Sequence, residues 1–304
     1  MNFSDNASYA ASKYISLEVK APAQLLPFLM EQMSGASRNK VKDILTGRGV
    51  MVDRKTVTRH DYELVPGNVV LVCRHKRSTE LTNRFVKIVY EDKELVVIEK
   101  GEGILSMANA AGQFCVKMVL DEYFRKRQFK CHAHVVHRLD RETSGLMIYA
   151  KRIECAQALQ SDWHNIVYDR RYVAVVCGEM PQEGGTVESY LKDNKACITY
   201  SSPTDNGGKL AVTHFRRLRV GGGLTLVELK LETGRKNQIR VHMADLGFPV
   251  LGDLKYGGRG TSLGRLCLHA YRLHFYHPMT GAPMQFETPI PTPFLQLFNE
   301  QQTN

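Results

Sequence analysis

The sequence predicts an α+β protein in which a small α/β domain precedes a large domain built on a mixed, mostly antiparallel sheet with flanking helices. Many short apolar runs are separated by turn residues, whereas few segments show apolar residues at helical spacing. A polar, charged stretch at 75–83 separates a first part with two helical segments from the remainder. The expected parts are 1–13 (flexible N-terminus), 14–74 (small domain), 75–83 (linker), 84–296 (large domain) and 297–304 (polar tail).

The small domain is expected to combine two helices with short strands. Apolar spacing and turn residues predict a strand at 15–19, a helix at 24–33, a helix capped by Ser37, a hairpin turning at Asp53-Arg54 and a strand at 69–72.

The large domain is expected to be a sheet with three helices. Its predicted strands are 86–90, 95–98, 146–150, 172–176, 186–191, 198–201, 210–219, 224–233 and 272–276. Its predicted helices are 114–129, 156–167 and 237–246. The Pro-rich segment 278–293 is assigned no element.

The net charge of +10 is the least ordinary feature of the composition. Residues 1–78 contain twelve Lys or Arg and seven Asp or Glu, so a quarter of the chain carries half of the excess. Such an excess indicates a polyanionic partner, either nucleic acid or an acidic membrane surface. A merely soluble cationic surface is the open alternative.

The sequence also predicts a cytoplasmic protein that does not span a membrane. No stretch approaches the roughly 20 apolar residues of a membrane-spanning helix, and residues 1–13 lack the apolar core of a secretory signal. The seven cysteines are scattered and form no Cys-x-x-Cys pair, which favours reduced thiols.

The stretch from His137 to Leu146 carries the first candidate for chemistry. Asp140 lies between Arg138 and Arg141, directly ahead of a predicted buried strand. An acid flanked by cations in a loop at a strand end is a place where a depressed pKa and a functional role are both plausible. The alternative is a structural ion pair that holds the loop.

A second informative stretch runs from Thr233 to His242. A strand stops at Thr233-Gly234, and a helix then begins among Arg235, Gln238 and Arg240. Two guanidinium groups beside a helix start can bind phosphate or fix a carboxylate, so this cluster could hold Asp140 ionised. The alternative is a polar rim that pairs with nearby acids.

A metal site has weaker support. Cys131, His132, His134 and His137 crowd seven positions, and all four side chains can ligate zinc. No second cluster with metal-ligand spacing occurs in the sequence, so we expect no metal.

The order of elements in the small domain resembles the RNA-binding domain named after ribosomal protein S-four. In that family the basic second helix and the following loop lie against RNA. The resemblance implies RNA contacts from Arg38, Lys40, Lys42 and Arg48. Asp53-Arg54 stands where the family usually has Asn-Gly, and the alternative is a packing domain whose charges are only solvated.

The large domain resembles the RluA-type pseudouridine synthases over residues 84–293. The stretch from His137 to Leu146 is similar to the family signature. Further motifs match in the same order, namely the hairpin at 88–100, Arg170-Arg171-Tyr172, the stretch 233–257, Leu268-His269-Ala270 and His277-Pro278. There are two departures: Gly101 stands where Pro is usual, and Lys236-Asn237 stands where Thr-His or Ser-His is usual.

This resemblance implies isomerisation of uridine to pseudouridine within structured RNA, without any cofactor. Large-subunit ribosomal RNA is expected in preference to transfer RNA. Asp140 would be the nucleophile or electrostatic partner, and Arg240 would pair with it and keep it charged. Tyr172 would stack on the extracted uracil and its hydroxyl could move a proton, although a core aromatic is the alternative.

The implied RNA contacts of the large domain are Arg138, which would fill the gap left by the everted base, and Arg141, Arg170 and Arg235. We expect the protein to act as a monomer. The competing class is a non-catalytic RNA-binding or ribosome-assembly protein on the same scaffold, and a metal-dependent hydrolase is third. The two RNA-binding classes predict salt-dependent RNA affinity, and only the enzyme predicts tritium release from uridine labelled at carbon-5.

Overall fold

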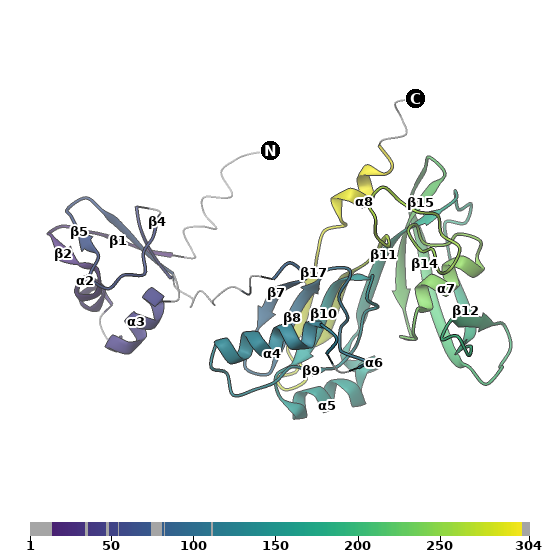
Figure 1. The fold of residues 1–304 in the computed structure, drawn as a ribbon, viewed down its shortest axis with the longest axis horizontal. Helices are drawn as coiled ribbons and strands as arrows, with labels where there is room; N and C mark the ends of the chain where they lie inside the picture. The colour runs from purple at the N-terminus through teal and green to yellow at the C-terminus, as the bar shows by residue number, and fades with distance from the viewer. Residues whose placement is uncertain are drawn as a thin grey trace. The chain divides into compact units, whose positions relative to one another are not determined.

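The computed structural model describes residues 14–33, 36–46, 49–53, 55–73, 81, 83–110 and 112–299, without the side chains of Tyr14, Asn39, Lys40, Asp43, Thr46 and Cys73. The chain divides into two compact units, Met1–Leu81 and Thr82–Asn304, each with its own apolar core. The predicted α+β class is confirmed, because the second unit is a large mixed sheet with few helices (Figure 1). None of the helices in the described ranges is long and apolar enough to cross a membrane.

The first unit is a small sheet packed with two helices. A four-stranded antiparallel sheet has the order β1 (Tyr14–Glu18), β6 (Val69–Cys73), β3 (Val50–Val52) and β4 (Lys55–Thr56). A separate pair consists of β2 (Ala23–Gln24) and β5 (Glu63–Leu64). The predicted helices are present as α2 (Leu25–Gln32) and α3 (Arg38–Thr46), and their apolar faces supply Leu25, Leu29, Val41 and Leu45 to the core.

The hairpin turn of the first unit is stabilised by Asp53. Its backbone is left-handed (φ 48°), a conformation that Asp tolerates better than most residues. Its carboxylate accepts hydrogen bonds from the Val69 amide at 2.9 Å and the Asn68 side chain at 2.7 Å. These bonds give a physical reason for Asp where the resembled family has Asn. Arg48 and the side chain of Lys40 lie outside the described residues.

The second unit is organised around an eleven-stranded sheet. Its main path runs β13 (Thr199–Ser202), β12 (Gly184–Asp193), β14 (Lys209–Gly221), β15 (Leu224–Leu231), β11 (Asp169–Cys177), β16 (Leu268–Tyr276), β10 (Ser144–Ala150), β8 (Leu95–Lys100) and β7 (Val86–Glu91). Off this path, β17 (Pro283–Glu287) pairs with β16 and β9 (His134–Val135) pairs with β10. Within the described residues, the neighbouring strands of this sheet are antiparallel except for β10 and β16.

Helices cover parts of this sheet. They are α4 (Val116–Lys126), α5 (Ile153–Ser161), α6 (Trp163–Ile166), α7 (Gln238–Asp245) and α8 (Thr292–Gln296). Helix α5 packs on β10, and α7 lies against β13 and β14 (Figure 1). Two large apolar clusters form separate parts of the core: one contains residues of β8, β10, α5 and β16, and the other contains residues of β11, β15 and α8.

Three predictions for the second unit need correction. The single helix predicted at 156–167 is two helices, because the chain leaves helical geometry at Asp162 (φ −131°, ψ 36°). The Pro-rich segment contains β17, which begins at Pro283 and pairs only with β16 in the described structure. Pro is tolerated at the first residue of an edge strand, so its presence did not exclude a strand here. The same segment also contains the start of α8.

Gly145 makes the parallel junction between β10 and β16 possible. The register there is Ser144 with His269 and Gly145 with Ala270. Gly145 has φ +122°, and a Cβ atom on it would overlap the backbone nitrogen and oxygen of Ala270. Only glycine satisfies both constraints. The junction lies just after Asp140 in sequence, so it fixes where the candidate loop leaves the sheet.

We expect Gly145→Ala to destabilise the protein by about 3 kcal/mol or more, since it adds backbone overlap to positive-φ strain. Gly247→Ala is the matched control, because Gly247 also has positive φ (+83°) but a Cβ atom on it would meet no other atom within 4 Å. That control should cost about 1 kcal/mol. Urea unfolding measures both, and equal losses would contradict the overlap at the junction.

Candidate active site

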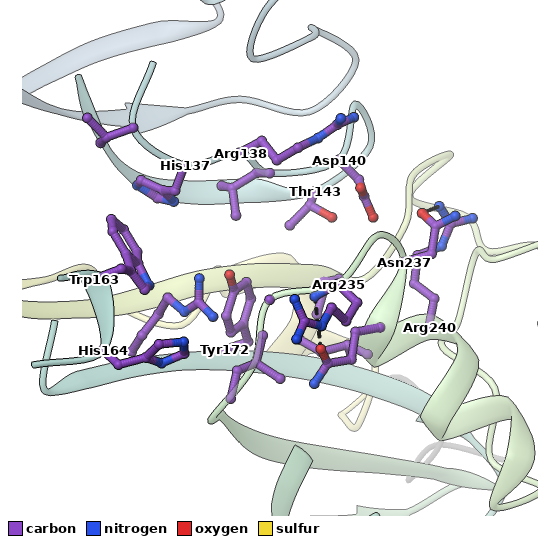
Figure 2. A pocket seen from close by; sticks show the side chains of 18 residues that line it. His137, Arg138, Asp140, Thr143, Trp163, His164, Tyr172, Arg235, Asn237 and Arg240 are labelled. Atoms are coloured by element: carbon purple, nitrogen blue, oxygen red, sulfur yellow. Dashed lines mark hydrogen bonds between the residues drawn. The ribbon is translucent and has the colours of Figure 1, made fainter. Parts of the chain in front are cut away.

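A cavity of about 310 Å³ opens beside the β10–β16 junction (Figure 2). Four parts of the chain supply its walls: the loop before β10, strand β11 with the preceding α6, the segment from Leu231 to α7, and Leu268 at the start of β16. The cavity brings together six of the predicted site residues, namely Arg138, Asp140, Arg170, Tyr172, Arg235 and Arg240. Arg141 is not part of the lining and donates from Nε to the Gly103 carbonyl at 3.2 Å.

Asp140 lies in the loop between β9 and β10, which Ser106 holds in place. The Ser106 hydroxyl accepts from the Leu139 amide at 3.1 Å and lies 2.8 Å from the Leu139 carbonyl, to which it can donate. Burial raises the pKa of Asp140, while Arg240 and Arg138 act in the opposite direction. The expected depressed pKa is therefore wrong: the cost of removing the carboxylate from water outweighs the attraction of the nearby guanidinium groups.

Arg240 forms its ion pair with Asp253, not with Asp140 as predicted from the sequence. Its Nε and one terminal nitrogen each donate to an Asp253 carboxylate oxygen at 2.7 Å, and the Asp253 side chain is fully buried. Figure 2 shows Asp140 and Arg240 as separate side chains on the cavity wall. The fork geometry of the guanidinium satisfies one carboxylate completely, so Arg240 acts on Asp140 only through its charge at longer range.

Asn237 connects Arg240 to the cavity wall. It has left-handed geometry at the start of α7 (φ 53°), and its side-chain oxygen accepts from Arg240 at 3.2 Å. Its side-chain nitrogen donates to the Tyr256 hydroxyl at 2.9 Å. The neighbouring Lys236 instead bonds to Asp193 at 2.8 Å and does not line the cavity. The two residues that depart from the resembled family therefore have different structural roles.

Tyr172 lines the cavity although the residue is only 5% exposed. The pairing of β11 with β16 shifts register between Arg171 and Tyr172, and such a bulge can re-aim a side chain. Burial raises the pKa of Tyr172, so its hydroxyl keeps its proton at neutral pH. Tyr172 is therefore both a mostly buried aromatic residue and part of the cavity wall. The two interpretations of this residue from the sequence are compatible.

Lys100 and Gly101 have structural roles that the sequence did not indicate. The fully buried Lys100 ammonium donates to the carbonyls of Gly101, Ile104 and Arg141 at 2.8–3.1 Å. Burial lowers the pKa of Lys100 to about 8. The Gly101 amide donates to the Phe85 carbonyl at 2.7 Å, a bond that the usual Pro could not make. Lys100 therefore ties the Asp140 loop to the end of β8.

The predicted alternative of a zinc site gains no support from the geometry. His137 accepts the Ile148 amide at 2.9 Å, and the His132 side chain is 81% exposed. Across the ranges that the structure describes, no three His, Cys, Asp or Glu side chains are grouped so that they could hold a metal ion.

The sequence indicated no role at the site for Asp253, Trp163 or Lys100, and it indicated His137 only as a possible zinc ligand and as the first residue of the candidate stretch. Asp253 lies within the stretch 233–257 that resembles the family, but residue type alone did not show which acid would pair with Arg240. Trp163 sits in a helix of four residues that was predicted as part of a longer one. Its position in the cavity wall depends on the break at Asp162, which the sequence pattern did not reveal.

The architecture is that of pseudouridylate synthases. The human RNA pseudouridylate synthase domain-containing protein 4 is similar to this chain with a TM-score of 0.58 at 24% identity, covering 71% of this chain and 92% of that one. The human domain-containing protein 1 is similar with a TM-score of 0.53 at 25% identity, covering 69% and 85%.

The sequence comparisons agree with the fold. Residues 94–245 match the family model described as RNA pseudouridylate synthase. An uncharacterised RNA pseudouridine synthase of Bacillus subtilis is 36% identical, covering 84% of this chain and 92% of its own length. Ribosomal large subunit pseudouridine synthase D of Escherichia coli is 32% identical, covering 88% and 87%. The chain belongs to the RNA pseudouridylate synthase family, and its reaction class is an isomerisation.

Proposed function

We propose that this enzyme converts uridine to pseudouridine in structured large-subunit ribosomal RNA, with Asp140 as the group that acts on the target nucleotide. The observation that carries the proposal is the shared cavity: Asp140, Tyr172 and Arg240 come from three segments far apart in sequence and line one space. The ribosomal substrate is inferred from the name of the Escherichia coli relative and from the chain's net charge of +10. We expect the enzyme to act in the cytoplasm, where it would meet this RNA.

The chemistry requires a carboxylate that faces the ribose. The bond from C1′ to N1 of uracil breaks, the base turns, and C5 bonds to C1′; the C5 proton leaves and N1 gains a proton. The reaction is balanced without an oxidant, a reductant or a transferred group. Breaking the glycosidic bond develops positive charge on the sugar, and a fixed carboxylate stabilises that charge. Three roles are open to Asp140 in this reaction: attack on the sugar, attack on the base and removal of a sugar proton.

A paired uridine must leave its helix before it reaches such a cavity. Arg138 is exposed and lines the cavity, so it is suited to fill the space that the everted base leaves. Arg141 and Arg235 are also exposed, and Arg170 lies deeper, with one hydrogen bond to the Thr233 carbonyl at 3.1 Å. We assign these four guanidinium groups to the RNA backbone and bases around the target.

Tyr172→Phe separates the two roles that we assign to this side chain. The ring is kept, so stacking on uracil and RNA affinity should stay near the wild-type values. If the hydroxyl moves a proton during the reaction, kcat should fall by about 10²-fold or more. Single-turnover rates of pseudouridine formation measure this. Tyr172→Leu should also weaken binding, and an unchanged kcat for Tyr172→Phe would restrict Tyr172 to stacking.

The first unit is proposed to bind RNA through α3. Replacing Arg38 and Lys42 by Ala should lower RNA affinity and reduce the slope of log affinity against log salt by about two, because each phosphate contact contributes about one. Lys20→Ala is the control, since Lys20 is an exposed cation of the same unit outside α3. An unchanged slope in the double variant would assign these charges to solubility.

Pseudouridine mapping of cellular RNA in a deletion strain tests the proposed substrate. We expect loss of pseudouridine at one or a few positions of the large-subunit ribosomal RNA, restored by the wild-type gene and not by Asp140→Asn. Loss confined to transfer RNA would contradict the ribosomal assignment. An unchanged map would favour a non-catalytic role on this scaffold.

A further inference from the structure

The cavity extends beyond the space around Asp140. Figure 2 shows Asp140, Asn237 and Arg240 at one end, Trp163 and His164 at the other, and Tyr172 between them. Trp163 is the single tryptophan of the chain. The chemistry assigned to Asp140 and Tyr172 uses none of the residues at this second end.

Three side chains give the second end its character. The rings of Trp163 and His137 are tilted against each other with centroids 4.8 Å apart. The Arg170 guanidinium lies 5.7 Å from the Trp163 ring and 6.0 Å from the Tyr172 ring, so it stands between the two ends. We call His137, Trp163 and Arg170 the aromatic subsite. Trp163 is only partly buried, so some of its indole remains accessible.

His137 contains a buried donor that lacks an acceptor. Its Nε2 accepts the Ile148 amide at 2.9 Å, so the proton of the neutral ring is on Nδ1. Burial lowers the pKa of His137 to about 3, which keeps the ring neutral at physiological pH. Among the described residues, Nδ1 is buried without a hydrogen-bond partner. Buried donors are normally satisfied. His137 is one of the residues that line the cavity, so we take its unpaired Nδ1 as the donor that remains for a ligand.

We propose that the aromatic subsite binds a second nucleobase of the RNA, adjacent to the target uridine, which stacks on Trp163 and accepts a hydrogen bond from His137 Nδ1. The proposal rests on RNA being the substrate. A neutral imidazole beside an indole offers a base an aromatic face for stacking. The Arg170 guanidinium of the subsite lies against the rings of Trp163 and Tyr172 and already donates to the Thr233 carbonyl, so we infer a base in preference to a phosphate. Uracil, cytosine and guanine offer a carbonyl oxygen to the donors of His137 and Arg170. Adenine offers only ring nitrogens, and its amino group, itself a donor, lies beside N1 and N7, so we expect it to fit less well.

Fluorescence of the single tryptophan reports occupancy without requiring catalysis. The full chain is titrated with single-stranded oligouridylate and with an abasic oligoribose phosphate of equal length. Stacking should quench Trp163 with oligouridylate, while the abasic strand should leave the emission nearly unchanged. Equal quenching by both strands, or by neither, would overturn base stacking on Trp163. The titration does not measure pseudouridine formation. A negative result would therefore refute the second base subsite and leave the proposed function intact.

A variant series tests selectivity at the same subsite. The substrate is a pool of stem-loop RNAs with one loop uridine and randomised neighbours, and pseudouridine is mapped by sequencing. Wild type should prefer carbonyl-bearing bases over adenine at one position next to the target uridine. Trp163→Ala should reduce that base preference and weaken oligouridylate binding about tenfold. Trp163→Phe should retain most of both, which separates stacking from a folding defect. Ile153→Ala, at an exposed position of α5, should match wild type. If Trp163→Ala folds and keeps the wild-type preference and affinity, the second base subsite is refuted.

Discussion

Asp140→Asn is expected to bind RNA with near wild-type affinity and to form pseudouridine at least about a thousandfold more slowly. The amide has the shape of the carboxyl group, so the cavity should stay intact. The amide lacks the negative charge that would stabilise the positive charge developing on the ribose. Binding is measured by filter retention, and conversion by single-turnover assay on the same RNA. Rates within tenfold of wild type would remove Asp140 from the chemistry.

The same substitution should stabilise the protein at neutral pH. Because burial raises the pKa of Asp140, the folded state favours the protonated acid. Such a group adds stability below its unfolded pKa of about 4, and that contribution is lost as the pH rises through the folded-state pKa. Asp140→Asn should therefore melt at a higher temperature than wild type at pH 7, with a smaller difference in acid. A lower melting temperature at pH 7 would mean that the ionised carboxylate stabilises the fold.

The buried pair of Arg240 and Asp253 should produce the largest change in stability. Asp253→Ala leaves a buried guanidinium without its carboxylate, which typically costs about 3–5 kcal/mol. Activity should fall as well, because Asp253 positions Arg240 at the cavity. Urea unfolding and single-turnover rates measure the two effects.

Two further variants make this test specific. Asp193→Ala breaks the half-exposed pair with Lys236, and it should cost less than about 1 kcal/mol. Replacing Arg240 by Met and Asp253 by Leu together removes both charges, so it should be more stable than Asp253→Ala alone. If Asp253→Ala and Asp193→Ala cost the same, the Arg240–Asp253 pair is not acting as a buried pair.

The sequence predicted the elements well because apolar periodicity is a local property. The strands around Asp140, Tyr172 and the start of α7 were expected near their observed positions. Six of the residues expected to form the site share one cavity, and Arg141 does not line it. Periodicity could not show that β10 and β16 pair in parallel through Gly145 and Ala270, since that contact spans 125 residues. It also did not show β17: Met284 and Phe286 alternate with polar residues as in a strand, but the surrounding Pro residues led us to assign no element there.

The electrostatics of the site were the least predictable part. Asp140 sits between two arginines in sequence, which suggested a depressed pKa, but the fold places it in a cavity wall, where burial raises its pKa. Several acids lie near Arg240 in the sequence. Which of them pairs with Arg240 depends on the path of the loop that follows α7. The tautomer of His137 likewise depends on a strand amide that only the fold brings to it.

Tritium release tests the role of Asp140 most directly. Large-subunit ribosomal RNA with tritium at uracil C5 is given to wild-type protein and to Asp140→Asn at matched bound fractions. We predict that wild type releases tritium in step with pseudouridine formed, because C5 must lose its proton to restore the ring double bond after bonding to C1′. Asp140→Asn should release almost none. Release by Asp140→Asn at the wild-type rate would contradict the role of this carboxylate.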